Sequence, residues 1–141
     1  RRAKLGLLRG SQKAGVKPAK LLAITQLTST SEEQMREEQL VNASLTESVR
    51  HYAQLAQSSG ADGVISSALA DPMIYRSTSD DFLCINPGIR LESDSADDQK
   101  RVVTPAQAAE LGSNGLVVGR SITKAADPVA AYGKIAQEWE K

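Results

Sequence analysis

The sequence predicts an α/β fold built on a parallel sheet, because short apolar runs alternate along the chain with segments that carry helix signals. These runs lack a regular alternation of polar and apolar residues, which is typical of parallel strands buried on both faces. We expect one strand in each of the four runs: 21–27, 63–65, 82–85 and 116–118.

The first well-marked helix begins after Ser44, a favourable N-cap residue with Glu47 at the third helical position in a capping-box arrangement. Gly60 follows the expected end of this helix. Its predicted apolar stripe consists of Leu45, Val49, Tyr52 and Ala56. Segment 68–77 stays open, because Pro72 can either begin a helix there or break one.

Two further helices are predicted to begin with a proline directly after a capping residue. Thr104 precedes Pro105 in the first of them, which should end near Gly112. Asp127 precedes Pro128 in the second. The expected inner side of this last helix consists of Val129, Tyr132, Ile135 and Trp139.

Two architectures accommodate such strand–helix units. A doubly wound sheet carries its glycine-rich phosphate loop after the first strand, whereas Gly119 and Arg120 follow the last predicted strand here. A (β/α)8 TIM barrel often builds a phosphate site after its last two strands. We therefore expect such a barrel, of which this chain covers about the last four units. Residues 1–141 would be the C-terminal half of a single domain, with 1–20 the remnant of a preceding helix and loop.

The composition of the chain limits the kinds of molecule that it is expected to bind. The formal net charge is zero, which argues against a nucleic-acid partner, since proteins that bind through bulk charge neutralise many phosphates at once. No apolar stretch is long enough to span a bilayer, and segment 1–8 lacks the apolar core of a signal peptide, so we expect a cytoplasmic protein without a membrane partner. Cys84 is the single cysteine and lies in an apolar run, which favours a core position.

The clearest candidate for ligand binding is segment 119–123, Gly-Arg-Ser-Ile-Thr, after the last predicted strand. Glycine lets the backbone approach a phosphate closely, and the N–H groups of a following short helix can point toward it. Arg120 can bind two phosphate oxygens through its planar guanidinium. From spacing alone, a strand-to-helix turn with a surface arginine explains the segment equally well.

Further candidates follow the first and third predicted strands. Thr28 belongs to a hydroxyl-rich segment and is the best ligand candidate within it. The polar loop from Leu91 to Val102 can form a lid over a substrate, with Arg90 and Gln99 as its best ligand-facing residues. The acidic residues of this loop are interpreted as solvated surface: Asp94, Asp97 and Asp98.

Two other polar residues have structural interpretations. His51 lies on a predicted outer helix and is interpreted as a bystander. Asp62 precedes the second strand, at the barrel face where special residues usually serve stability. The sequence contains no metal-ligand cluster, no Ser-His-Asp or Cys-His arrangement and no Walker loop, so we expect no metal site.

The segments that carry these features resemble the bacterial orotidine 5′-phosphate decarboxylase family. The resemblance extends from about Leu21 to the end of the chain, and its strength comes from the order and spacing of the segments rather than from any one of them. They are LLAITQLTSTS (21–31), ADGVI (61–65), PGIR (87–90), DDQKRVVTP (97–105) and VVGRSIT (117–123).

This resemblance implies a role for each matched residue. Gly119 and Arg120 would hold the 5′-phosphate of the substrate, and Gln99 would bridge phosphate and pyrimidine. Arg90 would lie in the phosphate region and support loop closure, while Thr28 would line the substrate pocket. The resemblance further implies decarboxylation of orotidine 5′-monophosphate to uridine 5′-monophosphate and CO2, without a cofactor, by a homodimer.

One part of the family's pattern is absent. Its catalytic aspartate and lysine come from an Asp-x-Lys-x-x-Asp motif in the first half of the barrel, and no segment here matches that motif. Lys100 and Lys124 fall on segments that match the family without a catalytic role. We therefore expect the catalytic residues upstream of this chain, and we expect the chain alone to be inactive.

Two other interpretations stay open. One is a non-catalytic half-barrel that binds phosphate or a nucleotide, and the other is a related decarboxylase acting on another phosphorylated substrate, such as a phosphosugar. Four parallel strands alone would leave two open sheet edges, which favours the enzyme over the first alternative. The segment around Thr28 and the loop with Gln99 favour the orotidine enzyme over the second.

Overall fold

The computed structural model describes residues 1–92 and 100–140. In chain order its elements are α1 (Arg2–Ala14), β1 (Leu22–Ile24), α2 (Glu32–Glu38), α3 (Leu45–Ser58), β2 (Gly63–Ile65), the 3-10 helix η1 (Ala68–Ala70), α4 (Asp71–Ser77), β3 (Leu83–Asn86), α5 (Pro105–Glu110), β4 (Gly115–Leu116), α6 (Arg120–Thr123) and α7 (Pro128–Trp139). None of the helices in these ranges is long and apolar enough to cross a membrane.

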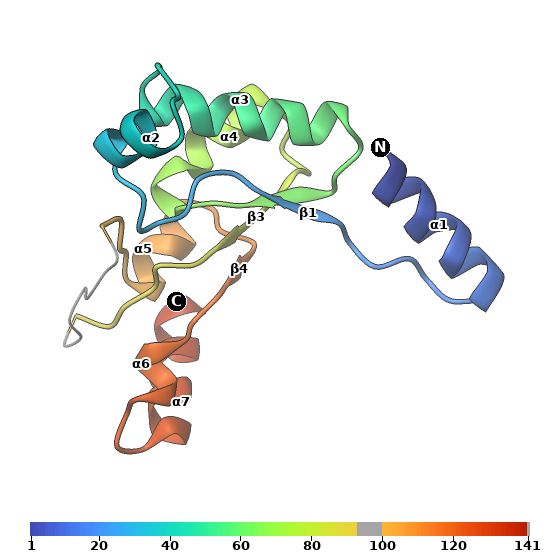
Figure 1. Cartoon of the computed structure of the whole chain (residues 1–141). Helices are drawn as coiled ribbons and strands as arrows, with labels where there is room; N and C mark the ends of the chain where they lie inside the picture. The colour runs from blue at the N-terminus through green and yellow to red at the C-terminus, as the bar shows by residue number, and fades with distance from the viewer. Residues whose placement is uncertain (93–99, 141) are drawn as a thin grey trace.

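The four predicted strands form one parallel sheet in the order β1-β2-β3-β4, which confirms the predicted fold class (Figure 1). Ala23 lies opposite Val64, and Val64 lies opposite Cys84, so the central strands are in close register. Each strand pairs with its neighbour in sequence, as in a (β/α)8 barrel, whereas the order of a doubly wound sheet reverses. All carboxyl ends therefore lie along one edge of the sheet.

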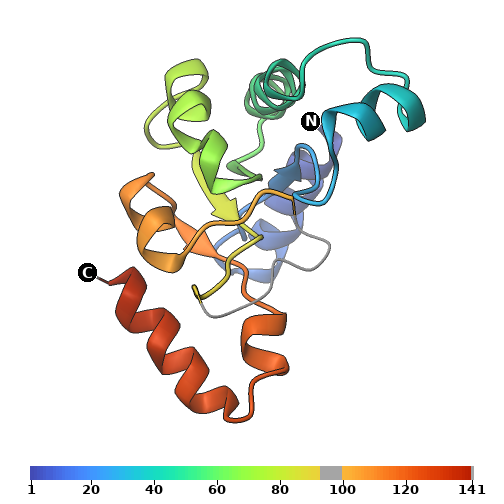
Figure 2. The same ribbon diagram turned by 90° about the vertical axis from the view of Figure 1, so that its left-hand side faces the viewer.

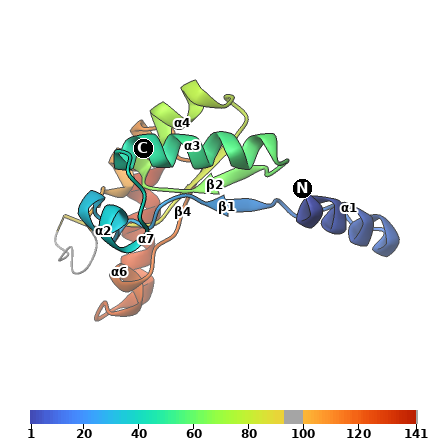
Figure 3. The ribbon, with the colours of Figure 1, turned by 45° about the horizontal axis from the view of Figure 1, so that its top comes forward.

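Helices α3 and α4 cover one face of the sheet (Figures 1 and 3). Val64 of β2 and Cys84 of β3 are fully buried there, against Val49 and Ala53 of α3 and Ile74 of α4. Burial raises the pKa of the Cys84 thiol to about 12, so the thiol stays protonated at neutral pH. The predicted core role of Cys84 is confirmed.

The opposite face of the sheet is apolar and open in the described structure. Side chains alternate across a strand, so the neighbours of the buried central residues point away from the helices. Ile24 of β1 is 59% exposed and Val117, directly after β4, is 49% exposed. Ile65 and Ile85 are half-buried between them. In a closed barrel this face is the interior.

Local signals set most of the element boundaries. The hydroxyls of Ser44 and Thr104 accept the backbone N–H groups of Glu47 and Gln107, so both predicted helix starts are confirmed. Pro72 opens α4 rather than breaking it. Strands β1 and β4 are shorter than predicted, and β3 runs on to Asn86.

The prediction for the last helix is partly wrong. Asp127 caps α7 and Pro128 begins it, as expected. Ile135 is buried, but Val129 and Tyr132 of the predicted inner side are 82% and 63% exposed. The reason is that α7 packs mainly on α5 and α6 at the margin of the fold and not flat against the sheet (Figure 2).

Asp62 joins three segments at the amino-terminal ends of the strands, as the structural interpretation of this residue predicts. Its carboxylate accepts the N–H of Leu21 at 2.7 Å and a hydrogen bond from Lys4 at 2.5 Å. Lys20 lies 3.9 Å away. The Leu21 N–H, followed by Lys4, holds the pKa of this carboxyl below its ordinary value.

We expect Asp62→Asn to lower the free energy of unfolding by about 1.5–3 kcal/mol, the usual range for a hydrogen bond to a charged group. The depressed pKa means that this stabilisation is present above pH 3.8, the ordinary value, and is lost as the pH falls through the folded value. Urea unfolding between pH 3 and 7 measures it, with exposed Asp80→Asn as the matched control. A deficit that is independent of pH contradicts the assignment.

Candidate functional site

The carboxyl ends of the strands border a cavity of about 320 Å³. Its wall includes Thr28 from the segment after β1, Arg90 from the segment after β3, and Gly119 with Arg120 after β4. The floor is apolar and comes from the open face of the sheet, through Ile24, Ile65 and Val117. The structure thus brings together four of the five residues selected from the sequence. The fifth, Gln99, lies outside the described residues.

Thr28 is held by the segment that follows β1. The chain leaves the sheet at Thr25, whose N–H and hydroxyl both donate to the carbonyl of Ile65. Gln26 turns to the helix side, where its side-chain amide donates to Gln39 at 3.0 Å and to Ser48 at 3.1 Å. Thr28 itself is 5% exposed. Strand pairing does not extend to Thr28, so contacts outside the sheet hold this part of the chain.

Arg90 follows β3 on a backbone that pairs with the end of the 91–102 loop. The N–H of Arg90 donates to the carbonyl of Val103 at 3.0 Å, and the N–H of Val103 donates to that of Gly88 at 3.2 Å. The guanidinium donates to the carbonyl of Ile89 at 2.8 Å, and Arg90 is 8% exposed. A buried arginine at this edge of the sheet places positive charge beside the cavity.

Gly119 and Arg120 begin the short helix α6. The carbonyl of Gly119 accepts the N–H groups of Ile122 and Thr123 at 2.9 and 3.0 Å. A Cβ added to Gly119 would meet no atom within 4 Å, so its backbone is accessible on the cavity side. Ser121 is buried, and its hydroxyl donates to the carbonyl of Ile89 at 3.4 Å, which joins α6 to the end of β3.

The charges of the cavity favour an anionic ligand. Arg90 and Arg120 belong to its wall, and no carboxylate does so among the described residues. The buried carboxylate Asp71 lies on the helix side, where desolvation raises its pKa to about 6 against hydrogen bonds from Asn86 and Ser113. His51 is exposed on α3. In the described ranges, no three His, Cys, Asp or Glu residues form a metal-binding group.

Lys100 and Lys124, for which the sequence indicated no catalytic role, are not part of the cavity wall. The ammonium of Lys100 donates to the side chain of Gln34 at 2.9 Å. Lys124 is exposed after α6. The sequence analysis did not predict the apolar floor of the cavity. It also did not predict that Gln26 and Arg101 hold the segment that leads to Thr28. Because successive side chains of a strand point to opposite faces, the continuous apolar runs could have indicated an apolar second face, whereas no local pattern marks Gln26 or Arg101.

A parallel sheet whose strands run in sequence order, with a cavity at their carboxyl ends, is the arrangement of part of a (β/α)8 barrel. Residues 3–135 match the model of the Orotidine 5′-phosphate decarboxylase / HUMPS family. The chain belongs to this family.

Individual relatives agree with this assignment. The chain is 61% identical over 135 residues to the orotidine 5′-phosphate decarboxylase of Latilactobacillus sakei, covering 96% of this chain and 56% of that protein. It is 56% identical over 137 residues to the enzyme of the same name from Listeria innocua, covering 97% and 58%. The chain thus spans about half the length of the curated relatives it matches.

Solved structures show the same relation. The crystal structure of orotidine 5′-phosphate decarboxylase from Lactobacillus acidophilus matches with a TM-score of 0.75 and 43% identity, covering 91% of this chain and 52% of that one. The enzyme of the same name from Pyrococcus horikoshii, at 16% identity and a TM-score of 0.57, covers 86% and 50% and supports the fold alone.

We expect Gly88→Ala to destabilise the strand-like pairing beside Arg90. Gly88 has φ +79°, and an added Cβ would lie 2.7 Å from the carbonyl oxygen of Arg101 and 3.3 Å from Thr28. Left-handed backbone and this overlap together should lower the free energy of unfolding by about 1–3 kcal/mol. Denaturant unfolding measures the loss. Gly133→Ala, in open space within α7, is the control and should be neutral or stabilising; equal effects at the two sites contradict the prediction.

Proposed function

We propose that this chain is the phosphate-binding, carboxyl-terminal half of a (β/α)8-barrel orotidine 5′-phosphate decarboxylase. The complete protein converts orotidine 5′-monophosphate to uridine 5′-monophosphate and CO2. The observation that carries the proposal is the cavity that joins Thr28, Arg90, Gly119 and Arg120 at the carboxyl ends of the strands. Family membership and the high identity to proteins of that name support it.

In this proposal the phosphate is bound beside β4. Arg120 donates charge-assisted hydrogen bonds to its oxygens, and the accessible backbone at Gly119 lets the phosphate approach. Arg90 adds positive charge from the end of β3, and Gln99 bridges phosphate and pyrimidine. Thr28 contacts the substrate from the opposite side of the cavity. Each charge-assisted hydrogen bond contributes roughly 1.5–3 kcal/mol.

These contacts are remote from the bond that breaks. Loss of CO2 leaves a carbanion at C6 of the pyrimidine, which needs a positioned proton donor. The cavity wall contributed by the described residues includes neither a lysine nor an aspartate. The Asp-x-Lys-x-x-Asp motif of the family therefore supplies the chemistry from outside this sequence, without a cofactor. The residues described here supply binding energy that orients the reacting base.

The remaining attributes follow from the family. We propose that residues 1–141 belong to a single barrel domain, with 1–20 contributing a preceding helix and loop. The helix α1 and the extended segment after it agree with that division. We further propose that the complete protein is a cytoplasmic homodimer without a nucleic-acid or membrane partner. Its pathway is the biosynthesis of pyrimidine nucleotides.

We expect Arg120→Ala in the complete protein to lower kcat/KM for orotidine 5′-monophosphate by at least about a hundredfold, since roughly two charge-assisted hydrogen bonds are lost. For orotidine, which lacks the phosphate, kcat/KM should not change. Steady-state kinetics with both substrates measures the difference. Arg76→Ala, at an exposed position on α4, is the control. An unchanged kcat/KM for the phosphorylated substrate refutes the phosphate role.

We also expect this chain alone to show no decarboxylase activity, because the described cavity wall lacks the groups that decarboxylation needs. The measurement is release of CO2 from orotidine 5′-monophosphate by a preparation whose mass spectrum contains this chain only. Conversion by that preparation at the rate of the complete protein contradicts the division of labour proposed here.

A further inference from the structure

Arg101 reaches from the end of the 91–102 loop to the backbone that precedes Thr28. Its Nη2 donates to the carbonyl of Leu27 at 2.5 Å and to that of Gln26 at 3.3 Å. The backbone beside it makes a third link, because the N–H of Lys100 donates to the carbonyl of Thr28 at 3.2 Å. Three successive carbonyls are thus held by residues about 75 positions away in sequence.

The guanidinium of Arg101 is only partly satisfied by hydrogen bonds. Within the described ranges it forms no ion pair, and its Nε–H is buried without an acceptor. Burial lowers the pKa of this arginine. A partly buried charge that lacks a carboxylate partner costs stability. Among the described residues, its hydrogen bonds are the two from Nη2 to the carbonyls of Gln26 and Leu27, so the contacts of this guanidinium are directed at the segment before Thr28.

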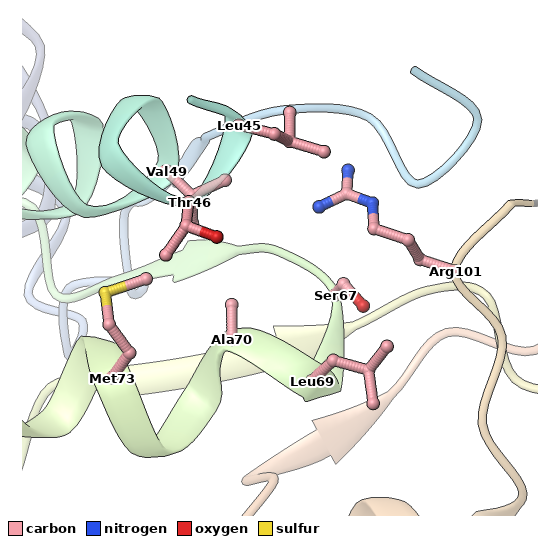
Figure 4. Close-up of a pocket in the computed structure, with 8 residues that line it drawn as sticks. All are labelled: Leu45, Thr46, Val49, Ser67, Leu69, Ala70, Met73 and Arg101. Carbon is pink, nitrogen blue, oxygen red and sulfur yellow. The ribbon is translucent and has the colours of Figure 1, made fainter. Parts of the chain in front are cut away.

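Arg101 donates to backbone carbonyls of residues that line one cavity and belongs to the wall of a second. The first is the candidate site, which includes Gln26, Leu27 and Thr28 in its wall. The second is a cavity of about 250 Å³ between α3 and α4, where Figure 4 shows the guanidinium reaching toward Leu45. The walls of that second cavity are mostly apolar, such as Val49 and Met73, and its described lining includes no carboxylate that could pair with the charge.

The same segment is fixed from its other side. The side chain of Gln26 donates to Gln39 and Ser48 on the helix layer, and the Gln39 amide donates back to it at 3.2 Å. Gln26 thus anchors the beginning of the segment, while Arg101 holds the carbonyls leading to Thr28. Without Arg101, these described contacts would leave the carbonyl of Leu27 without its side-chain donor.

We propose that Arg101 is a positioning residue for substrate binding, which holds the Gln26–Leu27 backbone so that Thr28 stands at the wall of the substrate cavity. This inference rests on the function proposed above. Arg101 touches no substrate in this arrangement and acts only through Thr28. Displacing a binding group by about 1 Å can reduce activity roughly a hundredfold.

A double-mutant cycle in the complete protein tests the inference. Arg101→Met should lower kcat/KM roughly 10- to 100-fold, for orotidine 5′-monophosphate and for orotidine alike, because Thr28 does not contact the phosphate. In a Thr28→Ala background the same change should cost less than about threefold. Arg101→Lys, which keeps the charge and N–H donors, should recover part of the loss. Arg76→Met, at an exposed position on α4, is the control.

Each outcome decides the inference. Unchanged kinetics in Arg101→Met overturns it, and so do losses that multiply with those of Thr28→Ala. If Arg101→Met does not fold, Arg101→Lys is carried through the same cycle with the same criterion. Failure of the wild-type protein to decarboxylate either substrate overturns the proposed function instead. In that case, crystal structures of the wild type and of a folded Arg101 variant test this inference separately. Thr28 should be displaced in the variant, and an unchanged position overturns the inference.

Discussion

Parallel pairing of β1 through β4 is the constraint on which the candidate site depends. Because the strands are parallel and in sequence order, each strand delivers the residues that follow it to the same edge. Thr28 and Arg120 follow the two outermost strands, which in a flat sheet would lie roughly 14 Å apart. Both belong to the wall of one cavity. A shared cavity across the whole width of the sheet agrees with a sheet that curves around it, as a barrel requires.

The two faces of the sheet have different roles. On the helix side, Val64 and Cys84 are sealed by α3 and α4, so burial of this face stabilises the units. On the other side, Ile24 and Val117 are still largely exposed to solvent in the described structure, although their chemistry is that of a core. The part of this face at the carboxyl ends of the strands forms the floor of the cavity. The packed core and the candidate site thus lie on opposite faces of the sheet.

The sequence was most informative where a local rule operates. Three features follow from patterns spanning a few residues: capping at Ser44 and Thr104, the core position of Cys84, and the location of Thr28, Arg90 and Arg120 at the cavity beside the carboxyl ends of the strands. The failures have a different cause. Exposure of Val129 and Tyr132 depends on which elements α7 packs against, and amphipathic spacing does not contain that information. Arg101 was missed because its partners are main-chain carbonyls, which no side-chain motif reveals.

The support of Thr28 also explains why an arginine outside the cavity belongs to the binding machinery. Thr28 stands on a segment that has left the sheet, so strand pairing cannot hold it after Thr25. Gln26 fixes this segment to the helix layer, and Arg101 fixes it to the segment that pairs beside β3 through Val103. A displacement beside β3 would therefore reach Thr28 through these hydrogen bonds. The segments that follow β1 and β3 are thus joined by hydrogen bonds, and the proposed positioning of Thr28 depends on contacts outside the cavity wall.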